Sequence, residues 1–385
     1  MNRVAVLGGG PAGAFAAEQI AARGLDVQLF DEKLAWEKPC GGGLTYKAYA
    51  HYPFLLENPA PKRRVTEMVV AGPTAGNVSL KLQDPLVIYS RLDLNRLLLD
   101  RAAAAGAQLE CARVLSISRQ RSGWQIRTNR GTAEADFCIV ATGARNGLRQ
   151  VGAEFGARDV MSALGYYVPG DQQHIEIRFL PRLEGYIWVF PRCGHLSVGI
   201  CGKGEPASAL RAKLEAFMHS RDLATQDAKF YSHLLPSLSP HSWRNNRVAG
   251  DGWMAVGDAA GLVDPITGEG LFYAIRSGDL AAGVLLSDAP APERSARYRK
   301  LLADDFGSDL EMGSRLAHRF YLGRFLGGEI TDRIVQFTRR SERFQAVARD
   351  LFSGRQQYLG LRRRLYRNLG GTLWEIGRSW FPAEA

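Results

Sequence analysis

Hydrophobic and polar positions change their period twice in the first 33 residues of the chain. Residues 3–8, RVAVLG, form a short apolar run, and residues 14–24, AFAAEQIAARG, repeat with the period of a helix. Residues 26–33, DVQLFDEK, form a second apolar run that closes on acidic residues, and the turn GGGPAG precedes the helical segment. This order of strand, turn, helix and strand predicts a βαβ unit.

Apolar runs farther along the chain are short and are separated by glycine and proline. We expect these runs to be strands of a second sheet, at residues 65–72, 77–82, 174–180, 186–191 and 195–200. The last part of the chain, from residue 290, contains frequent arginine, leucine and aromatic residues and few β-branched runs, which favours helices. The pattern therefore predicts an α/β fold, in detail an α+β composite with an inserted antiparallel sheet and a helical C-terminal region.

The composition favours a globular protein with reduced cysteines. A chain of 385 residues with 46% hydrophobic residues is long enough for a large core and, by its length, for two domains. Its five cysteines are an odd number without the spacing of metal ligands, and no secretory leader precedes the first apolar run. We therefore expect a cytoplasmic protein without disulfides or a metal site. No apolar stretch reaches the roughly 18 residues of a membrane span.

Positive charge is concentrated at the C-terminal end of the chain. The net charge is +10, and residues 313–385 contain 14 arginines against 6 acidic residues. The segments RFYLGRFL and LRRRLYRNL interleave these arginines with aromatic residues. Such a surface suits anionic lipid or a diphosphate-bearing substrate, and no nucleic acid is expected because no binding motif accompanies the charge. Ordinary amphipathic helices with solvated arginines are the alternative.

The turn of the βαβ unit carries a dinucleotide fingerprint. Gly8, Gly10 and Gly13 fit the pattern G-x-G-x-x-G. In this pattern the first glycine forms the tight turn, the second lets a pyrophosphate approach the main chain, and the third allows close packing of helix on strand. Asp31 follows Gly13 by 18 residues, close to the spacing of the acid that accepts a ribose hydroxyl. The combination predicts a bound adenine dinucleotide.

Two further glycine-rich turns have a physical interpretation of their own. Gly268 and Gly270 follow Pro265 and precede the helical run LFYAIRSGDLAAGVLL, so N–H groups and the positive end of the helix dipole face a ligand there. Residues 41–43, in PCGGGL, let the main chain lie close to a bound ring or substrate, where any Cβ would collide. A flexible surface loop is the alternative for this second turn.

Three sequence blocks resemble the FAD-dependent p-hydroxybenzoate-hydroxylase-like superfamily. They are YSRLDLNRLLLDRA, GTAEADFCIVATGARNG and GDGWMAVGDAAGLVDPITGEGLFYAIRSG. The resemblance implies that the dinucleotide is FAD, that Asp258 contacts its ribityl chain and phosphates, and that Arg91 opens a helix beside the flavin. Hydroxylases, halogenases and reductases share this fold, so the fold alone leaves the reaction open.

The segments KPCGGGL, GYIWVFP and DPITGEGLFYAIRSG resemble, as an ordered set, the geranylgeranyl reductase family. The resemblance implies an FAD-dependent reductase that saturates isoprenoid carbon–carbon double bonds. It also implies that Tyr186, Trp188 and Phe190 line an apolar tunnel beside the flavin. Aromatic residues at alternate positions of a strand also pack in ordinary cores, which is the alternative.

An oxygen-using reaction is the rival interpretation. GYIWVFP is similar to the W-x-W-x-I pattern of flavin-dependent halogenases, with Tyr186 and Phe190 in place of the first tryptophan and the isoleucine. Halogenases of this type need a catalytic lysine, and the sequence assigns that role to neither Lys62 nor Lys81. A protein in which FAD is structural and the basic tail binds a partner is a third interpretation.

Reduction of an isolated alkene needs a hydride near one carbon and an acid near the other. Cys40, beside the second glycine turn, is a candidate acid because a free thiol is mainly protonated at neutral pH. Tyr186 is a second candidate. His51 is a candidate pocket residue, with a structural histidine as the alternative. The single fingerprint leaves two electron donors open, NAD(P)H docking transiently or a ferredoxin.

The resemblance and the patterns together give a full set of predicted sites. The predicted FAD-binding residues are Gly8, Gly10, Pro11, Ala12, Gly13, Asp31, Glu32, Cys40, Gly41, Gly42, Arg91, Ala141, Thr142, Gly143, Gly257, Asp258, Pro265, Gly268, Glu269 and Gly270. The predicted pocket residues are Gly43, Leu44, His51, Trp188 and Phe190, and the catalytic candidates are Cys40 and Tyr186.

The predicted domains follow from these placements. A composite FAD-binding domain of Rossmann type takes residues 1–60, 85–160 and 245–285, a substrate-binding sheet domain takes residues 61–84 and 161–244, and a helical region takes residues 286–385. The substrate is a lipophilic small molecule, and the basic C-terminal region is expected to contact the inner face of a membrane peripherally. The oligomeric state stays open.

Overall fold

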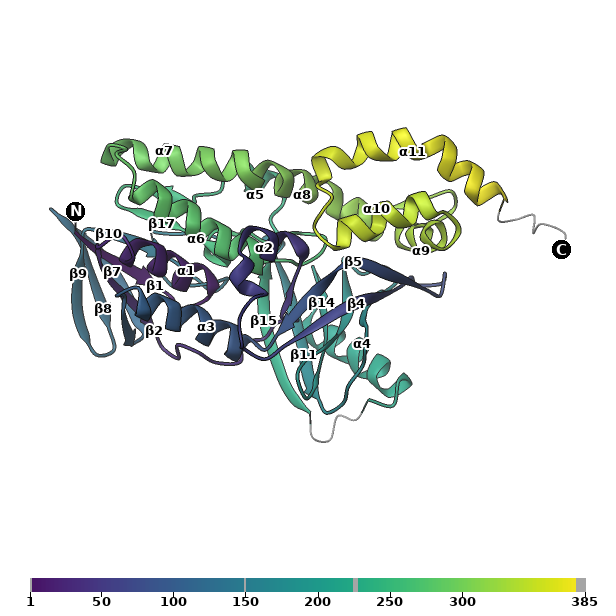
Figure 1. The fold of residues 1–385 in the computed structure, drawn as a ribbon, viewed down its shortest axis with the longest axis horizontal. Coiled ribbons are helices and arrows are strands. Elements are labelled where there is room, and N and C mark those ends of the chain that lie inside the picture. Colours follow the sequence, from purple (N-terminus) through teal and green to yellow (C-terminus); the bar gives the residue numbers. More distant parts are fainter. Residues whose placement is uncertain (1, 149, 224–227, 379–385) are drawn as a thin grey trace. The chain divides into compact units, whose positions relative to one another are not determined.

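The computed structural model describes residues 2–148, 150–223 and 228–378, which form two compact units (Figure 1). Unit 1 comprises Met1–Lys38, Ser90–Val160 and Leu234–Leu310, and unit 2 comprises Pro39–Tyr89, Met161–His233 and Glu311–Ala385. These boundaries differ from the predicted ones, because residues 39–60 belong to unit 2 and the predicted helical region 286–385 is divided between the two units after Leu310. The assignment of FAD binding and substrate binding to separate domains stays a prediction.

The central sheet of unit 1 has the predicted Rossmann-type βαβ core. Its strand order is β16-β17-β10-β1-β2-β6, and all neighbouring pairs are parallel except β16 and β17. The strands are β1 (Arg3–Leu7), β2 (Asp26–Asp31), β6 (Gln108–Cys111), β10 (Phe137–Val140), β16 (Ala249–Gly250) and β17 (Trp253–Ala255). The strands β1, β10 and β17 are almost wholly apolar and buried, as expected of a parallel sheet covered on both faces.

Helices and a small sheet complete unit 1. Helix α1 packs against both α3 and α6, and β7, β8 and β9 form an antiparallel three-stranded sheet. The helices are α1 (Pro11–Ala21), α3 (Arg91–Ala104), α5 (Pro240–Arg244), α6 (Leu271–Leu285) and α7 (Ala291–Leu302). The small sheet consists of β7 (Val114–Gln120), β8 (Gly123–Thr128) and β9 (Gly131–Ala135). Short turns of helix lie at η2 (Ala157–Asp159), η3 (Gly257–Ala260) and the π-helical η4 (Ala303–Gly307).

Unit 2 contains the predicted second sheet, in the order β15-β11-β14-β13-β12-β4-β5-β3. The described pairings are antiparallel except that between β12 and β4. The strands are β3 (Gly43–Leu44), β4 (Lys62–Ala71), β5 (Asn77–Tyr89), β11 (Val160–Val168), β12 (Ile175–Phe179), β13 (Gly185–Pro191), β14 (Leu196–Gly202) and β15 (Lys229–Pro236). All five strands that the sequence predicted are present, and β11 and β15 extend the sheet beyond them.

The two faces of this sheet differ in chemistry. Ile187 and Val189 of β13 belong to a buried aliphatic cluster with residues of α4 (Ala207–Ser220). Tyr186, Trp188 and Phe190 alternate with them and therefore point to the opposite face. We call this opposite face the aromatic face.

Helices form most of the C-terminal part of unit 2, as predicted, and Figure 1 shows α9, α10 and α11 packed together. The helices of this unit outside the sheet are α2 (Tyr46–His51), η1 (Pro53–Leu55), α8 (Ser308–Leu322), α9 (Ile330–Arg340), α10 (Glu342–Phe352) and α11 (Tyr358–Arg378). A hairpin of β18 (Arg324–Phe325) and β19 (Gly328–Glu329) interrupts the helical order. None of the described helices combines the length and the apolar character needed to cross a bilayer.

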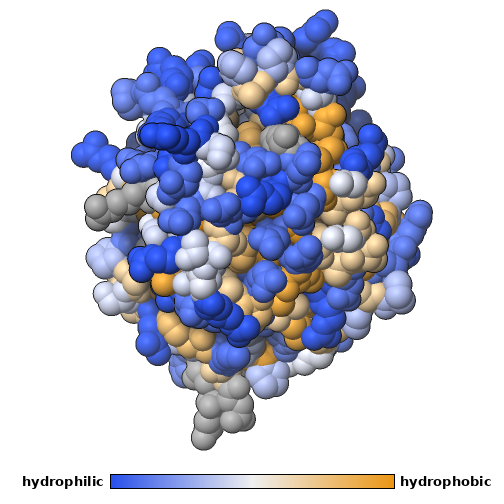
Figure 2. All heavy atoms as spheres, turned by 90° about the vertical axis from the view of Figure 1, so that its left-hand side faces the viewer, coloured by the Kyte–Doolittle hydropathy of each residue, from blue (hydrophilic) through white to orange (hydrophobic). Residues whose placement is uncertain are grey.

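The face shown in Figure 2 is largely hydrophilic, with hydrophobic residues in separate areas between the polar ones. This is the usual surface of a globular protein. The five cysteines are not paired with one another.

Candidate functional site

The first glycine turn, in unit 1, has the shape of a phosphate-binding turn. A Cβ on Gly8, whose φ is +120°, would lie 2.2 Å from the Ala141 carbonyl oxygen, and one on Gly13 would lie 2.0 Å from the Gly8 carbonyl oxygen. A Cβ on Gly10 would meet no atom within 4 Å. The protein itself requires the first and third glycines, whereas the absence of a side chain at Gly10 leaves space above the start of α1. This arrangement fits a dinucleotide pyrophosphate.

Asp31 has a role in this turn that the sequence did not predict. One of its carboxylate oxygens accepts a hydrogen bond of 2.7 Å from the Gly9 amide, and the other accepts bonds of 2.8 Å from the amides of Lys33 and Leu34. Asp31 therefore holds the glycine turn against the end of β2. A carboxylate accepts about four hydrogen bonds, so one position stays available for the predicted ribose hydroxyl. Glu32, beside it, is exposed.

A second group of predicted residues meets around Asp258. Its carboxylate lies 3.4 Å from the Lys38 ammonium, and a Cβ on Gly270 would lie 3.5 Å from the same carboxylate. A Cβ on Gly143 would lie 3.7 Å from the Lys38 ammonium. The segments that follow β2, β10 and β17 are thus brought together, as expected at the carboxyl ends of the strands of one parallel sheet. Lys38 was not predicted, because a lysine in a loop is usually solvated.

The same group connects to the helix α1. A Cβ on Gly257 would lie 3.1 Å from the Ala12 Cβ, and a Cβ on Gly278 would lie 2.4 Å from the Ala12 carbonyl oxygen. Helices α1 and α6 therefore approach each other closely at the end that carries the glycine turn. Pro11 occupies the first turn of α1, where its missing N–H costs nothing. The Thr142 hydroxyl donates to the Asn146 side chain over 3.0 Å.

The turn before α6 presents main-chain donors. Asp264 accepts hydrogen bonds of 2.8 and 2.9 Å from the amides of Ile266 and Thr267, which shapes the turn that contains Pro265. Gly268 adopts a left-handed φ of +70°. No side-chain hydrogen bond caps α6 at Gly270, so the first N–H groups of this helix suit an anionic ligand.

Arg91 is the first residue of α3, so it opens a helix as the resemblance implied. Its side chain is buried and bonds the Asn95 side chain over 3.1 and 3.3 Å, within α3. The Glu37 carboxylate accepts the amides of Arg91 and Leu92 over 3.0 and 3.2 Å, and Ser90 caps the same helix. An acidic side chain of the protein therefore occupies the start of α3. Contact of Arg91 with a flavin stays a prediction.

In unit 2, the second glycine turn lies against the aromatic strand. A Cβ on Gly41 or on Gly43 would lie 2.9 or 3.0 Å from the ring of Phe190. Gly43 and Leu44 form β3, which pairs with Ile88 and Val87 of β5. Gly43 and Leu44 therefore lie at an edge of the sheet. Gly41 and Gly43 make room for Phe190, a contact within the protein rather than with a ligand.

A buried arginine holds this turn in place. Arg192, which is 0% exposed, donates a hydrogen bond to the Cys40 carbonyl, and its guanidinium lies 5.4 Å from the centre of the Tyr167 ring. The Ser197 hydroxyl donates to the same Cys40 carbonyl over 3.2 Å and bonds the Tyr231 hydroxyl over 2.9 Å. Burial raises the pKa of the Tyr231 hydroxyl well above its ordinary value, so it stays protonated.

Gly42 completes the attachment of the turn. Its φ is +84°, and a Cβ there would lie 2.1 Å from the Tyr89 carbonyl oxygen and 3.3 Å from the guanidinium carbon of Arg192. The Gly42 amide donates to the Cys40 sulfur over 3.3 Å. Cys40 is thus fixed through both its carbonyl group and its thiol. Sequence reasoning missed Arg192 because arginine is almost never fully buried.

The aromatic side chains share one face of the sheet. The ring of Tyr186 lies 6.3 Å from that of Trp188 and 6.5 Å from that of Phe179, centre to centre. Trp188 lies across Gly199 of the neighbouring strand, where a Cβ would be 2.2 Å from the indole. Phe179 also contacts Phe320 of α8, at 5.5 Å. These side chains form an apolar wall in which Phe179 and Trp188 are buried, at 3% and 7% exposure, and the predicted tunnel along it stays a prediction.

One predicted pocket residue, His51, has no place in these clusters. His51 lies exposed at the end of α2, where its ring bonds the Lys47 carbonyl over 3.2 Å. Among the residues that the structure describes, no group of three histidine, cysteine or acidic side chains is arranged to hold a metal ion.

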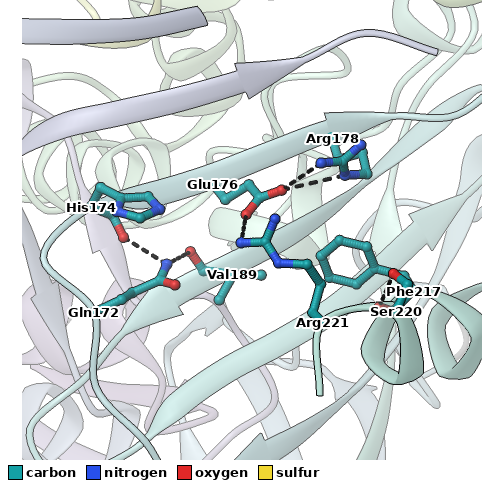
Figure 3. Close-up of polar contacts among 8 residues, drawn as sticks. All are labelled: Gln172, His174, Glu176, Arg178, Val189, Phe217, Ser220 and Arg221. Atoms are coloured by element: carbon teal, nitrogen blue, oxygen red, sulfur yellow. Dashed lines mark hydrogen bonds and ion pairs between the residues drawn. The ribbon is translucent and has the colours of Figure 1, made fainter. Parts of the chain in front are cut away.

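A buried carboxylate marks the opposite face of the sheet, away from the aromatic residues. Glu176, which is 2% exposed, bonds Arg178 over 3.0 Å and Arg221 over 3.0 Å (Figure 3). The guanidinium of each arginine also lies within 6.0 Å of the centre of the Phe217 ring. This group attaches the end of α4 to β12 and has a structural role.

The matching family model is the FAD-dependent oxidoreductase family, over residues 82–279, just over half of the chain. The menaquinone reductase of Mycobacterium tuberculosis is 30% identical over 354 residues, which cover 84% of this chain and 85% of the relative. The chloroplastic geranylgeranyl diphosphate reductase of Nicotiana tabacum is 27% identical over 323 residues, which cover 76% of this chain and 68% of the relative.

Solved structures share the fold. A geranylgeranyl bacteriochlorophyll reductase-like protein from Thermoplasma acidophilum superposes with a TM-score of 0.76 at 24% identity, covering 95% of this chain and 98% of its own. A flavin-dependent brominase superposes with a TM-score of 0.66 at 15% identity, covering 94% and 98% of the two chains. At these sequence identities the superpositions show a shared fold and carry no information on the reaction.

Proposed function

The chain belongs to the FAD-dependent oxidoreductase family, and we propose that it uses FAD to saturate carbon–carbon double bonds of a lipophilic isoprenoid substrate. The names of the relatives support this choice, because a geranylgeranyl diphosphate reductase and a menaquinone reductase both act on molecules of that kind. The observation that carries the proposal is the packing of the Cys40 turn on the aromatic strand β13.

We assign FAD binding to the two groups of residues in unit 1. The glycine turn at Gly8, Gly10 and Gly13 would hold the pyrophosphate at the start of α1. Asp258 and the uncapped N-terminus of α6 would contact the rest of the cofactor. The space at Gly10 and the free position on Asp31 support this assignment. When bound, reduced FAD supplies the hydride that the reaction requires.

We assign the acid and the apolar wall to unit 2. Addition of a hydride to one alkene carbon must be matched by a proton on the other, and the Cys40 thiol or the Tyr186 hydroxyl would hold that proton. Arg192 and Ser197 would keep the Cys40 main chain in position. Trp188 and Phe190 would exclude water and contact the hydrocarbon chain.

The electron donor and the cellular place are part of the same proposal. NAD(P)H or a ferredoxin would restore reduced FAD after each turnover. The protein would meet its substrate at the inner face of the cytoplasmic membrane, because long isoprenoid chains partition into bilayers.

An oxygen-using reaction is less well supported. The Lys62 ammonium donates to three oxygens of the turn at residues 58–60 and lies 5.5 Å from the centre of the Tyr89 ring. A lysine with these hydrogen bonds has a structural role in the turn. Lys81 lies on β5, opposite Glu67. Neither supports the catalytic lysine that a halogenase of the tryptophan type requires.

The test is reoxidation of the reduced protein without oxygen. Purified protein with FAD, reduced chemically, is mixed anaerobically with geranylgeranyl diphosphate, a prenylquinone or a prenyl ether lipid. Recovery of oxidised flavin absorbance and a product heavier by two hydrogens per double bond is the expected result. Cys40→Ala and Tyr186→Phe identify the acid, because loss of the proton donor slows turnover by about 100-fold or more. Reoxidation only after admission of oxygen contradicts the proposal.

A further inference from the structure

The helix α11 carries a second apolar surface besides the one by which it packs. Its inner face is attached to unit 2 by Arg364, which bonds Asp350 over 2.7 Å, and by Glu375, which bonds Ser341 over 2.5 Å. Thr372 and Tyr358 are buried on the same side. The inner face of α11 therefore packs on the rest of unit 2, and the outer face faces solvent.

The outer face is strongly apolar and strongly exposed. Five of its side chains are large and hydrophobic, with exposed fractions between 47% and 71%: Leu359, Tyr366, Leu369, Leu373 and Trp374. Leu359, Tyr366 and Leu373 follow one another at intervals of seven residues, so they form one line along the helix. Trp374, at 71%, is the most exposed large hydrophobic residue described in the chain. A line of exposed large apolar side chains of this kind is typical of an interaction site rather than of a solvated helix.

The charges on the outer face have one sign. Arg362, Arg363 and Arg367 are exposed between and beside the apolar side chains, and α11 has no exposed acidic residue. Two copies of this face placed against each other would bring arginines against arginines, which disfavours a dimer through it. An anionic surface is complementary instead. Arg362 also lies 5.4 Å from the centre of the Tyr366 ring, which keeps charge next to the apolar line.

We infer that the outer face of α11 binds the surface of an anionic phospholipid bilayer, with the helix lying in the plane of the interface. Leucine side chains enter the acyl region, and the amphipathic rings of Tyr366 and Trp374 take the boundary with the headgroups. The arginines pair with lipid phosphates. The inference deepens the membrane contact proposed above, but it is tested by binding alone, so its failure would leave the reductase proposal intact.

The test compares vesicles of phosphatidylcholine with vesicles that also contain phosphatidylglycerol. The full-length holoprotein is expected to float with the anionic vesicles, less so at high salt, and to remain free of the neutral ones. Leu373→Ser combined with Trp374→Ser should lower the affinity on the order of 100-fold, because two large apolar side chains leave the bilayer. Arg363→Gln combined with Arg367→Gln should lower it about 25-fold, at about fivefold per arginine.

Matched controls separate the face from the rest of the surface. Leu115→Ser removes an apolar side chain of β7 that is 43% exposed, and Arg121→Gln combined with Arg297→Gln removes two exposed charges elsewhere. All three control substitutions should leave binding unchanged. The α11 variants should keep their flavin absorbance and their turnover of a detergent-dispersed substrate.

A spectroscopic measurement places the helix directly. Lipids brominated along the acyl chains should quench part of the tryptophan emission, and Trp374→Phe should abolish that quenching while binding persists. Equal binding of the α11 variants and the wild type would overturn the inference. So would a lipid-free dimer in which residues 369–374 are protected from hydrogen exchange, since a second copy would then be the occupant.

Discussion

The guanidinium of Arg192 donates a hydrogen bond to the main-chain carbonyl of Cys40, 152 positions earlier in the sequence. Ser197, on the next strand, donates to the same oxygen over 3.2 Å. A buried cation and a hydroxyl from one hairpin thus fix the point where the Cys40 side chain leaves the main chain. A small shift of that point would move the thiol, whose placement the proposed reaction depends on.

Replacement of Arg192 should separate turnover from cofactor binding. Arg192→Met is expected to lower kcat about 10- to 100-fold, because displacement of a reacting group by about 1 Å costs up to about 100-fold. Flavin content should stay normal, and Arg192→Lys should recover part of the rate. Steady-state kinetics and the alkylation rate of Cys40 are the measurements. Arg211→Met, an exposed arginine of α4, is the control. Unchanged kinetics and alkylation in Arg192→Met would remove the positioning role.

Gly10→Ala should give a folded protein that binds FAD weakly. A methyl group there meets no protein atom within 4 Å, so the melting temperature of the apoprotein should not change. The methyl occupies the space assigned to the pyrophosphate, and FAD affinity should fall by about tenfold or more. Gly13→Ala, by contrast, should destabilise the apoprotein itself, because its Cβ would lie 2.0 Å from the Gly8 carbonyl oxygen. Titration of apoprotein with FAD and thermal melting distinguish the two.

Gly147→Ala is the control for this pair, since a Cβ at that position also meets no atom within 4 Å. It should change neither quantity. Full FAD affinity in Gly10→Ala would show that the pyrophosphate lies elsewhere.

The buried thiols should make the protein less stable at alkaline pH. Burial raises the pKa of Cys138 and of Cys201 from 9.0 to about 12. The unfolded chain therefore releases these protons first, so the stabilisation is fully present below pH 9 and is lost as the pH rises towards 12. Each thiol contributes a slope of about 1.4 kcal/mol per pH unit within that range.

Urea unfolding at several pH values between these limits measures that slope. The double variant Cys138→Ala with Cys201→Ala should show a shallower loss of stability than the wild type, whatever its stability at neutral pH. The exposed Cys111, replaced by alanine, is the control and should leave the slope unchanged. Parallel curves for the wild type and the double variant would contradict the assignment.

Glu176→Gln should lower stability without affecting turnover. The substitution leaves Arg178 and Arg221 beside a neutral group in a buried setting, at an expected cost of about 1–3 kcal/mol. The cost is limited because both arginines reach solvent, at 28% and 43% side-chain exposure. Glu134→Gln breaks an exposed pair with Arg3 and should change stability by less than about 0.5 kcal/mol. A large loss of kcat in Glu176→Gln would mean that this carboxylate also serves the site.

The sequence predicted the elements whose signals are local. The βαβ unit and the five strands of the second sheet have apolar periodicity and turn residues within a few positions of one another. Strand β11 was missed because Gly165 interrupts its apolar run. The structure gives the reason, since a Cβ on Gly165 would lie 2.6 Å from the Tyr231 hydroxyl, on a strand far along the chain. No local pattern contains that contact.

The same distinction applies to the candidate site. The glycine positions were predictable because glycine has few roles besides close approach and left-handed turns. The roles of Arg192 and Lys38 depend on what the fold brings next to them, and Asp31 was predicted for a ligand although three main-chain amides also use it. A charged residue is by default expected to be solvated, so the sequence does not predict the charged residues that hold the site in place through contacts within the protein.

The edge of the second sheet at β3 affects how the protein can associate with other molecules. Beyond β5 the sheet continues only with Gly43 and Leu44 of β3, and Pro85 removes one N–H donor from β5 itself. At this edge, a strand of another molecule therefore cannot pair along a long uninterrupted row of main-chain amides. Strand β3 and Pro85 thus make this edge of the sheet a poor template for β-sheet aggregation between molecules.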